Sequence, residues 1–272
     1  MRLRCSLGRR WAWCLGQLGD PRIYDLRDPR AYIEVPAGIY RYGEKKGRTV
    51  KIAAPFLLGR YPVTNSQYRA FVEDGGYRKQ EWWSDAGWNW LRKQEVTEPW
   101  RWRDRRWNSP NQPVVGVSFW EAEACCAWAG GRLPREEEWE AAAGGPEGNV
   151  YPWGNDWEDG ICNSVEVGLG VTSPVGLFPR SRQAELGIED LAGNVLEWCA
   201  AIDDHPENAA PGKHPETPSA VCGGAWPLPG NAVRSNVRVI LPSKLREQVM
   251  GFRVVCSSRL WTADLRSAKL SV

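Results

Sequence analysis

The stretch Val221–Cys256 reads VCGGAWPLPGNAVRSNVRVILPSKLREQVMGFRVVC. A short motif that is typical of a structural anchor stands at each end of it. Gly223–Trp226 opens it, and Gly251–Val255 closes it with a strand-like composition. Between the anchors the residues follow neither a helical nor an alternating period. Three prolines and a glycine interrupt any continuous helix or strand there. This pattern is typical of an irregular segment that carries contact side chains on a scaffold built elsewhere; the alternative is an ordinary loop between core strands.

Composition and charge restrict the class of protein. The formal net charge of +2 is too balanced to favour a nucleic acid or an anionic membrane as partner. No run approaches the roughly 18 apolar residues that span a bilayer. Met1–Arg4 is basic, but Arg9–Arg10 interrupts the apolar run that an export signal would need. We expect a cytoplasmic protein with no nucleic-acid partner and no membrane insertion.

Cysteine and histidine usage argues against a zinc site. The eight cysteines are dispersed without a CxxC motif, and the chain has only two histidines, His205 and His214. Most thiols are expected to be reduced. A Cys126–Cys256 disulfide stays open as an alternative, because intracellular proteins of thermophiles do contain disulfides.

Local patterns predict short elements in one α+β domain, with no repeat and no linker. Tyr32–Gly43 and Arg48–Thr64 are predicted strands joined by a charged turn. Capping-box spacing predicts one helix over Asn65–Glu73 and another that starts at Ser118 and runs through Trp128. A third helix is predicted over Arg135–Ala143, and the chain after it consists of short strands and turns.

Seven tryptophans between Trp82 and Trp107 alternate with basic residues. Such interleaving can bind single-stranded nucleic acid, or it can be aromatic packing with arginines stacked on indoles. Acidic residues dilute the positive charge of the segment, and a phosphate-tracking groove needs clustered positive charge. We therefore favour packing, in an insertion with little regular structure.

Eight motifs follow one another along the chain: Tyr61–Asn65, Pro113–Ser118, Trp128–Pro134, Tyr151–Asn155, Ser173–Gly176, Asp190–Trp198, Gly223–Trp226 and Gly251–Arg253. In this order they resemble the formylglycine-generating enzyme (sulfatase-modifying factor) superfamily over residues 31–256. The resemblance implies an α+β, C-type-lectin-like fold over residues 31–272, with a mostly antiparallel twisted sheet, two or three short helices and much irregular loop. Residues 1–30 are a lead-in whose structure the sequence leaves open.

The chemistry of the enzymes in this superfamily is not implied for this chain. The resemblance places two copper-binding cysteines shortly after the double glycine, because soft Cu(I) needs thiolates. Here no thiol lies between Trp226 and Cys256, and Cys222 fits a buried strand cysteine. An iron-dependent relative would need a histidine cluster, which His205 and His214 cannot supply. We expect no enzymatic activity and no required cofactor.

Besides the copper and iron enzymes, the superfamily has a third branch, the variable proteins of diversity-generating retroelements. In these proteins the motifs GGSW, RSAxR and GFRV form an invariant frame. The positions between the motifs are rewritten by adenine-directed mutagenesis of their codons. This sequence resembles that frame and departs from it at Cys222, Ala225 and Asn236. The resemblance implies a variable region over 221–256 that binds a macromolecule, which we expect to be a protein. Its implied ligand-contact positions are Leu228, Asn231, Val237, Val239, Ile240, Leu241, Lys244, Leu245, Glu247 and Gln248. Its implied scaffold positions are Gly223, Gly224, Trp226, Arg234, Arg238, Gly251, Phe252 and Arg253.

The superfamily resemblance also implies a structural Ca²⁺ held by Asp190, Gly193, Val195 and Glu197, since this hard ion favours carboxylate and carbonyl oxygens. The alternative is that Asp190 caps a turn and Glu197 pairs with an arginine. A second, weaker calcium site would lie around Asn163 and Glu166. Two other functions stay open: a divergent oxidase, or a scaffold module of a signalling or effector protein.

Overall fold

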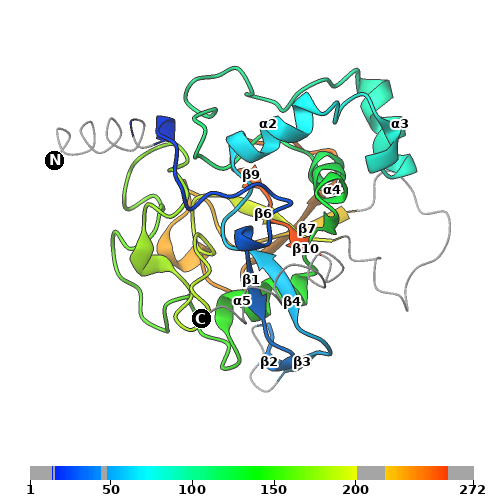
Figure 1. The fold of residues 1–272 in the computed structure, drawn as a ribbon. Helices are drawn as coiled ribbons and strands as arrows, with labels where there is room; N and C mark the ends of the chain where they lie inside the picture. The colour runs from blue at the N-terminus through cyan, green and yellow to red at the C-terminus, as the bar shows by residue number, and fades with distance from the viewer. Residues whose placement is uncertain (1–13, 15, 44–47, 201–217, 257–272) are drawn as a thin grey trace, which may run out of the picture.

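The computed structural model describes residues 14, 16–43, 48–200 and 218–256. Its helices and strands are short and alternate with long irregular segments (Figure 1). They are β1 (Tyr32–Val35), β2 (Gly38–Arg41), β3 (Thr49–Ile52), β4 (Phe56–Gly59), α2 (Asn65–Glu73), α3 (Asp85–Gln94), α4 (Phe119–Trp128), β5 (Gly131–Arg132), α5 (Glu136–Gly144), β6 (Leu196–Trp198), β7 (Pro218–Cys222), β8 (Arg238–Pro242), β9 (Met250–Gly251) and β10 (Val255–Cys256).

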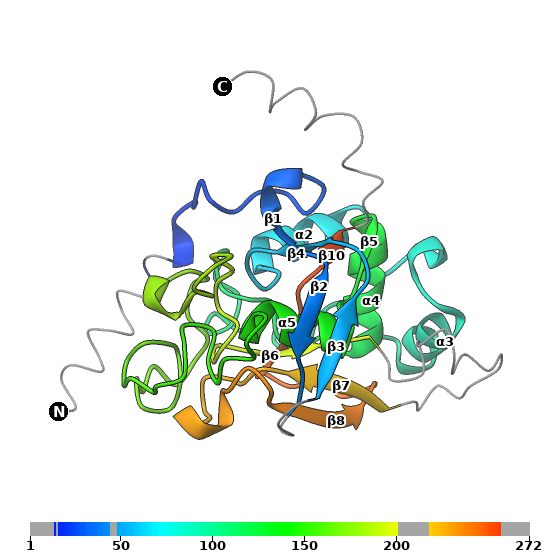
Figure 2. The same cartoon turned by 90° about the horizontal axis from the view of Figure 1, so that it is seen from below.

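Three sheets organise these strands. One has the order β1-β4-β10-β5, the hairpin β2-β3 forms a second, and the third has the order β8-β7-β6-β9. All pairings are antiparallel except β6 with β9. The C-terminal segment β10 lies between β4 and β5, so the first and last parts of the domain share one sheet. Figure 2 shows β7 and β8 along one side of the molecule, with β8 outermost. The predicted α+β fold with mostly antiparallel strands is confirmed.

The three predicted helices form because their ends are satisfied locally. In α2 and α4 the side chains of Thr64 and Ser118 accept the N–H groups of Gln67 and Glu121, which bond back in complete capping boxes. The third helix, α5, begins one residue later than predicted, and Arg135 is its N-cap. Each of the two predicted strand segments is split into a pair of strands, β1–β2 and β3–β4.

The prediction of little regular structure in the tryptophan-rich insertion was wrong for α3. Ser84 caps this helix by accepting the N–H of Gly87, and Glu95 ends it in the left-handed region at φ 50°. Gly87 and Leu91 are buried, and the Trp90 ring lies 5.1 Å from the Trp120 ring of α4. The helix is therefore stabilised by tertiary contact with α4, which the local sequence does not encode.

Five of the seven tryptophans of this segment are packed into the main core cluster or against it, Trp107 lies in a smaller cluster with Val115 and Val195, and Trp100 is exposed. Several cations stack on aromatic rings there, including Lys79 on Trp82 and Arg69 on Trp102. These contacts support aromatic packing rather than a nucleic-acid groove. Among the described residues no helix is long and apolar enough to cross a membrane.

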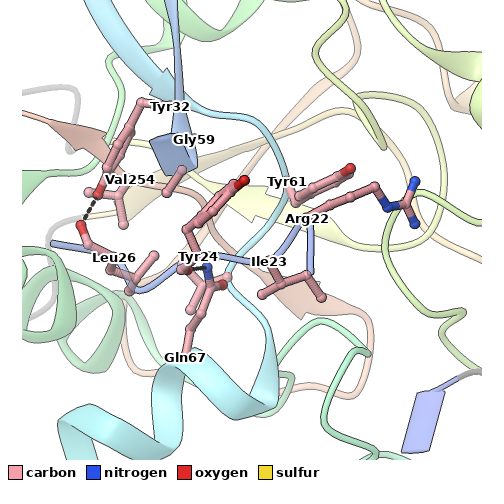
Figure 3. A pocket seen from close by; sticks show the side chains of 11 residues that line it. Arg22, Ile23, Tyr24, Leu26, Tyr32, Gly59, Tyr61, Gln67 and Val254 are labelled. Carbon is pink, nitrogen blue, oxygen red and sulfur yellow. Dashed lines mark hydrogen bonds between the residues drawn. The ribbon is translucent and has the colours of Figure 1, made fainter. Parts of the chain in front are cut away.

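The packed domain starts before residue 31. Leu26 is buried in the main core, its backbone oxygen accepts the Tyr32 hydroxyl, and Gln67 donates to the Tyr24 oxygen at 2.7 Å. Figure 3 shows these side chains around a cavity of about 10 Å³, room for about one water molecule. Part of the predicted lead-in thus belongs to the domain; residues 1–13 lie outside the described residues.

The alternative of a Cys126–Cys256 disulfide does not fit the structure, in which both cysteines are buried and no disulfide joins one to the other. Cys222 lies on β7 and is 3% exposed, as predicted for a strand cysteine. Burial raises the pKa of the Cys125 and Cys126 thiols well above the ordinary value. These thiols are therefore protonated and unreactive at neutral pH.

Candidate functional site

The anchors of the 221–256 segment are buried and tightly packed. Gly223 has φ +77°, and a Cβ on it would lie 2.9 Å from the Trp139 ring. A Cβ on Gly224 would lie 2.4 Å from a Val233 methyl group, so both positions exclude larger residues. Phe252 is completely buried in the main core. The backbone of the segment is therefore fixed at both ends by residues that face inward.

Arg253 is the electrostatic centre of this scaffold. It makes a two-pronged pair with Glu197, with Nε to Oε2 and Nη2 to Oε1 both at 2.6 Å, and both side chains are almost completely buried. Trp139 donates its indole N–H to the same carboxylate at 2.7 Å. Arg253 also donates to the backbone oxygens of Gly59 and Glu189. One side chain thus joins β4, β6 and the loop before β6.

Glu197 and Asp190, which were predicted to bind calcium, instead bind other groups of the protein. Both oxygens of Glu197 are occupied by Arg253, whose positive charge would repel a cation at the same place. Asp190 accepts the Gly176 N–H at 2.7 Å and an amide hydrogen of Asn194, and burial raises its pKa to about 6. As arranged, this set does not fit Ca²⁺. The structure follows the alternative, in which Glu197 pairs with an arginine.

At the weaker calcium site, Glu166 has protein partners, whereas the buried Oδ1 of Asn163 has no hydrogen-bond partner in the described part of the chain. Glu166 accepts the Ser164 hydroxyl and the Gly230 N–H, so it fastens the start of the variable segment. Among the residues that the structure describes, no three His, Cys, Asp or Glu side chains form a group that could hold a metal ion. His205 and His214 lie outside the described residues.

None of the ten predicted ligand-contact positions is fully buried. Val239 and Ile240 are 43% and 44% exposed, which is high for large aliphatic side chains. Five of the ten are exposed: Asn231, Val239, Ile240, Lys244 and Glu247. The other five are half-buried: Leu228, Val237, Leu241, Leu245 and Gln248. Leu228, Leu241 and Leu245 pack against the core from its surface, so they fix the segment as well as border its face.

The two exposed aliphatic side chains among these ten positions, Val239 and Ile240, lie on β8, an edge strand of its sheet. Gly223 donates to the Val237 oxygen, which sets the register, so Val239 and Leu241 direct their backbone groups toward β7. Arg238 and Ile240 direct theirs toward the open edge. A hollow of about 290 Å³ adjoins this strand and is lined by Ile240, Leu241, Pro242, Ser243, Lys244 and Pro218.

The predicted scaffold residues do not all act alike. Trp226 is half-buried, with its ring 5.8 Å from the Trp107 ring. Arg238 is exposed and donates to the Tyr42 hydroxyl at 2.7 Å and to Glu136 at 2.9 Å. It therefore fastens β8 to the β2–β3 hairpin and α5. Arg234 is half-buried, and Gly251 pairs with Glu197 in the parallel β6–β9 ladder.

Arg246 is a scaffold residue that the sequence did not reveal. Its guanidinium makes two contacts of 2.9 Å with the completely buried carboxylate of Glu121 and donates to the backbone oxygens of Gly116 and Glu98. Tyr77 donates to the same carboxylate at 2.6 Å. The fixed position of Glu121 in the capping box of α4 was the available signal, because a buried carboxylate requires a cationic or hydrogen-bonding partner.

Leu228 and Val233 lie shortly after the double glycine, in the stretch where the resemblance places copper-binding thiols. Both belong to an apolar cluster with Tyr151, Ile161 and Trp157. Cys162 is the single thiol of this cluster, and burial raises its pKa to about 12. A pair of thiolates for a soft metal ion is therefore missing from this part of the described chain.

Comparison with known proteins agrees with this fold. The family model of the sulfatase-modifying factor enzyme 1-like domain matches residues 24–258. The chain is 36% identical to the inactive C-alpha-formylglycine-generating enzyme 2 of Mus musculus over 223 residues, which cover 69% of this chain and 71% of that protein. It is 37% identical to the hercynine oxygenase of Mycolicibacterium thermoresistibile over 171 residues, which cover 58% of this chain and 38% of that enzyme.

The chain thus spans about two fifths of the length of that oxygenase. Among solved structures, Treponema denticola variable protein 1 matches with a TM-score of 0.59 at 18% identity, over 83% of this chain and 94% of that one. At this level of identity the match concerns the fold. The chain belongs to the sulfatase-modifying factor enzyme 1-like domain family, and its fold is the C-type-lectin-like fold of that family.

Proposed function

We propose that this protein is a non-enzymatic binding protein whose variable region, residues 221–256, is diversified by a retroelement and displays side chains to a protein ligand. The observation that carries the proposal is the separation of two kinds of position in this segment. Gly223, Gly224, Gly251, Phe252 and Arg253 are buried, whereas the ten predicted contact positions between them are exposed or half-buried. A surface that tolerates arbitrary side chains needs a backbone held by other residues, and this arrangement meets that need.

The edge strand β8 suits a protein ligand. Val239 and Ile240 offer apolar contact, and the exposed Lys244 and Glu247 offer polar contact. The backbone groups of Ile240 face the open edge, where an extended segment of a partner could pair with them. The proline at the end of β8 lacks an N–H, which limits uncontrolled edge pairing.

A divergent oxidase is the second candidate, because one relative is named an oxygenase. The side chains after Trp226 oppose it, since Leu228 and Val233 occupy an apolar cluster with a single thiol. Another relative is named inactive, so loss of catalysis has occurred within the family. A soft-metal site would have to be built from residues outside this cluster.

Genomic sequence tests the proposal directly. We expect a near-copy of the codons for residues 221–256 close to this gene, with differences at template adenines, and a reverse transcriptase gene beside it. Finding neither would refute retroelement diversification. Stoichiometric Cu(I) binding by the purified protein, or formation of an aldehyde on a cysteine-containing peptide, would instead support the oxidase.

A substitution library tests the display surface without knowledge of the ligand. We expect random residues at Val239, Ile240, Lys244 and Glu247 to leave most variants folded, because these side chains face solvent. The same library at Phe252 should leave few folded variants. Equal sensitivity of the two sets would contradict a tolerant display face.

A further inference from the structure

A cluster of aromatic side chains lies at the surface beside the start of the variable segment. It is formed by Tyr151, Trp153 and Trp157 on the loop after α5. The Tyr151 and Trp153 rings are stacked, with centres 5.0 Å apart and planes inclined by 5°, and the Trp157 ring lies 6.1 Å from that of Trp153. Tyr151 is buried, whereas both tryptophans are half-exposed. Two large rings therefore stay partly accessible to a partner.

Direct contacts join this aromatic face to the variable segment. A Cβ on Gly230 would lie 2.4 Å from the Trp157 ring, so the missing side chain lets the indole pack on the backbone there. Val165 donates its N–H to the Leu228 oxygen at 3.0 Å, and its own side chain is 51% exposed. Figure 2 shows the loops of this region next to the short turn that contains Gly230 and Asn231. The aromatic face thus adjoins the predicted contact positions Leu228 and Asn231.

The exposed charges around the aromatic face are mostly negative. Residues 136–179 contain no lysine, arginine or histidine. Within 151–180 four exposed side chains are acidic and one, Arg180, is basic; the acidic ones are Asp156, Glu158, Asp159 and Glu166. A cation is therefore attracted to this part of the surface.

The nearby arginines leave two of these carboxylates without a cation. Arg180 pairs with Glu158 at 2.5 Å. Arg234 is half-buried and lies near Tyr151, where burial raises the pKa of the hydroxyl and the arginine opposes that rise. Neither Asp156 nor Asp159 forms an ion pair with another residue that the structure describes. These two aspartates are thus available to a charged partner.

An arginine side chain matches this combination of groups. A guanidinium can stack on an indole and can also form two parallel hydrogen bonds with a carboxylate. Both kinds of partner are in contact here, because Trp157 donates its indole N–H to the Asp159 carboxylate at 2.7 Å. The formal net charge of the whole protein is +2, so attraction of a basic segment would be a property of this face and not of the protein in general.

We propose that the aromatic face, formed by Trp153, Trp157 and Val165 with Asp156 and Asp159 beside them, binds an extended, arginine-bearing segment of a partner protein. The inference goes beyond the proposed function, since all five of these residues lie outside the variable region and their role does not require diversification. The partner's arginines stack on the indoles and pair with the aspartates, and Val165 offers apolar contact next to them.

The experiment titrates labelled peptides with the purified full chain and follows fluorescence anisotropy. The probe is a peptide of Gly-Ser-Arg repeats, and two matched peptides carry lysine or glutamine in place of arginine. We expect the arginine peptide to bind more tightly than the lysine peptide, because only the guanidinium offers a planar fork, and the glutamine peptide to bind least. The double variant with Asp156→Asn and Asp159→Asn should bind the arginine peptide about fivefold more weakly, the effect of two exposed ion pairs.

The matched control removes two exposed carboxylates elsewhere, by Glu34→Gln on β1 and Glu73→Gln on α2, and so changes the net charge equally. It should bind the arginine peptide like the unaltered protein. Asparagine at position 159 keeps an oxygen that can accept the Trp157 N–H, so the aspartate variant should fold.

Three results would overturn the proposal. They are no binding of the arginine peptide, equally tight binding of the lysine or glutamine peptide, and equal affinity of the aspartate and control variants for the arginine peptide. None of these results bears on the genomic test of diversification.

Discussion

Replacement of Glu197 by glutamine should be among the most destabilising single changes in this protein. The change removes one charge and preserves the size of the side chain. Glutamine can still accept the indole N–H of Trp139, which lies 2.7 Å from the carboxylate. What it cannot do is neutralise Arg253, whose guanidinium is completely buried. Glu197→Gln therefore isolates the cost of an uncompensated buried charge.

The magnitude follows from the burial of the pair. Breaking a buried ion pair by removing one partner costs about 3–5 kcal/mol. Domains are stable by only about 5–15 kcal/mol, so a loss of about 3–5 kcal/mol is at least about a fifth of the total. The backbone oxygens of Gly59 and Glu189 continue to accept hydrogen bonds from Arg253, which places the expected loss at the lower end, about 3 kcal/mol.

Urea unfolding followed by tryptophan fluorescence measures the free energy of unfolding of each variant. The control is Arg103→Gln, which breaks the pair with Glu98; Arg103 is 84% exposed, so its loss should be much smaller than that of Glu197→Gln. The double variant with Glu197→Gln and Arg253→Met should regain part of the loss, since no buried charge is left. A loss below about 1 kcal/mol for Glu197→Gln itself would refute the central role assigned to this pair.

Four further outcomes are expected. Arg246→Met should cost about 3 kcal/mol in the same unfolding assay because it leaves a buried carboxylate unpaired, and a change within about 0.5 kcal/mol would contradict that anchor. Ile240→Ser should change the free energy of unfolding by less than about 0.5 kcal/mol, whereas a loss of 2 kcal/mol or more would mean that this side chain is part of the core. Burial raises the pKa of Asp190 to about 6 from an ordinary 3.8, so the folded state binds this proton more tightly than the unfolded state. The charged carboxyl therefore destabilises the folded state above pH 6, and this destabilisation is relieved as the pH falls toward 4. Asp190→Asn should thus be more stabilising, relative to the unaltered protein, at pH 7 than at pH 4. The opposite trend would contradict a raised pKa of Asp190. Calcium or a chelator should leave the melting temperature unchanged; a rise of several degrees with calcium that Glu197→Gln abolishes would restore the calcium site.

Features whose stabilising contacts join residues close in the sequence were predictable from the sequence. The capping boxes at Thr64 and Ser118 placed two helices correctly, because their hydrogen bonds join residues three positions apart. The glycine and aromatic anchors of the 221–256 segment were also predicted to be structural, and Gly223, Gly224 and Phe252 are buried. The α3 helix was missed, since its stability comes from packing on α4 rather than from its own composition.

The sequence by itself determined the family frame, the ends of the local helices and the position of a segment with buried anchors and no internal period. Only the tertiary structure decided what that segment is fastened to and which of its side chains reach solvent. Glu197 and Arg253 are 56 residues apart, and Glu121 and Arg246 are 125 residues apart. Whether a carboxylate binds an arginine or a metal ion depends on which strands and loops lie side by side, and that arrangement is set by the packing of the whole core rather than by any local pattern.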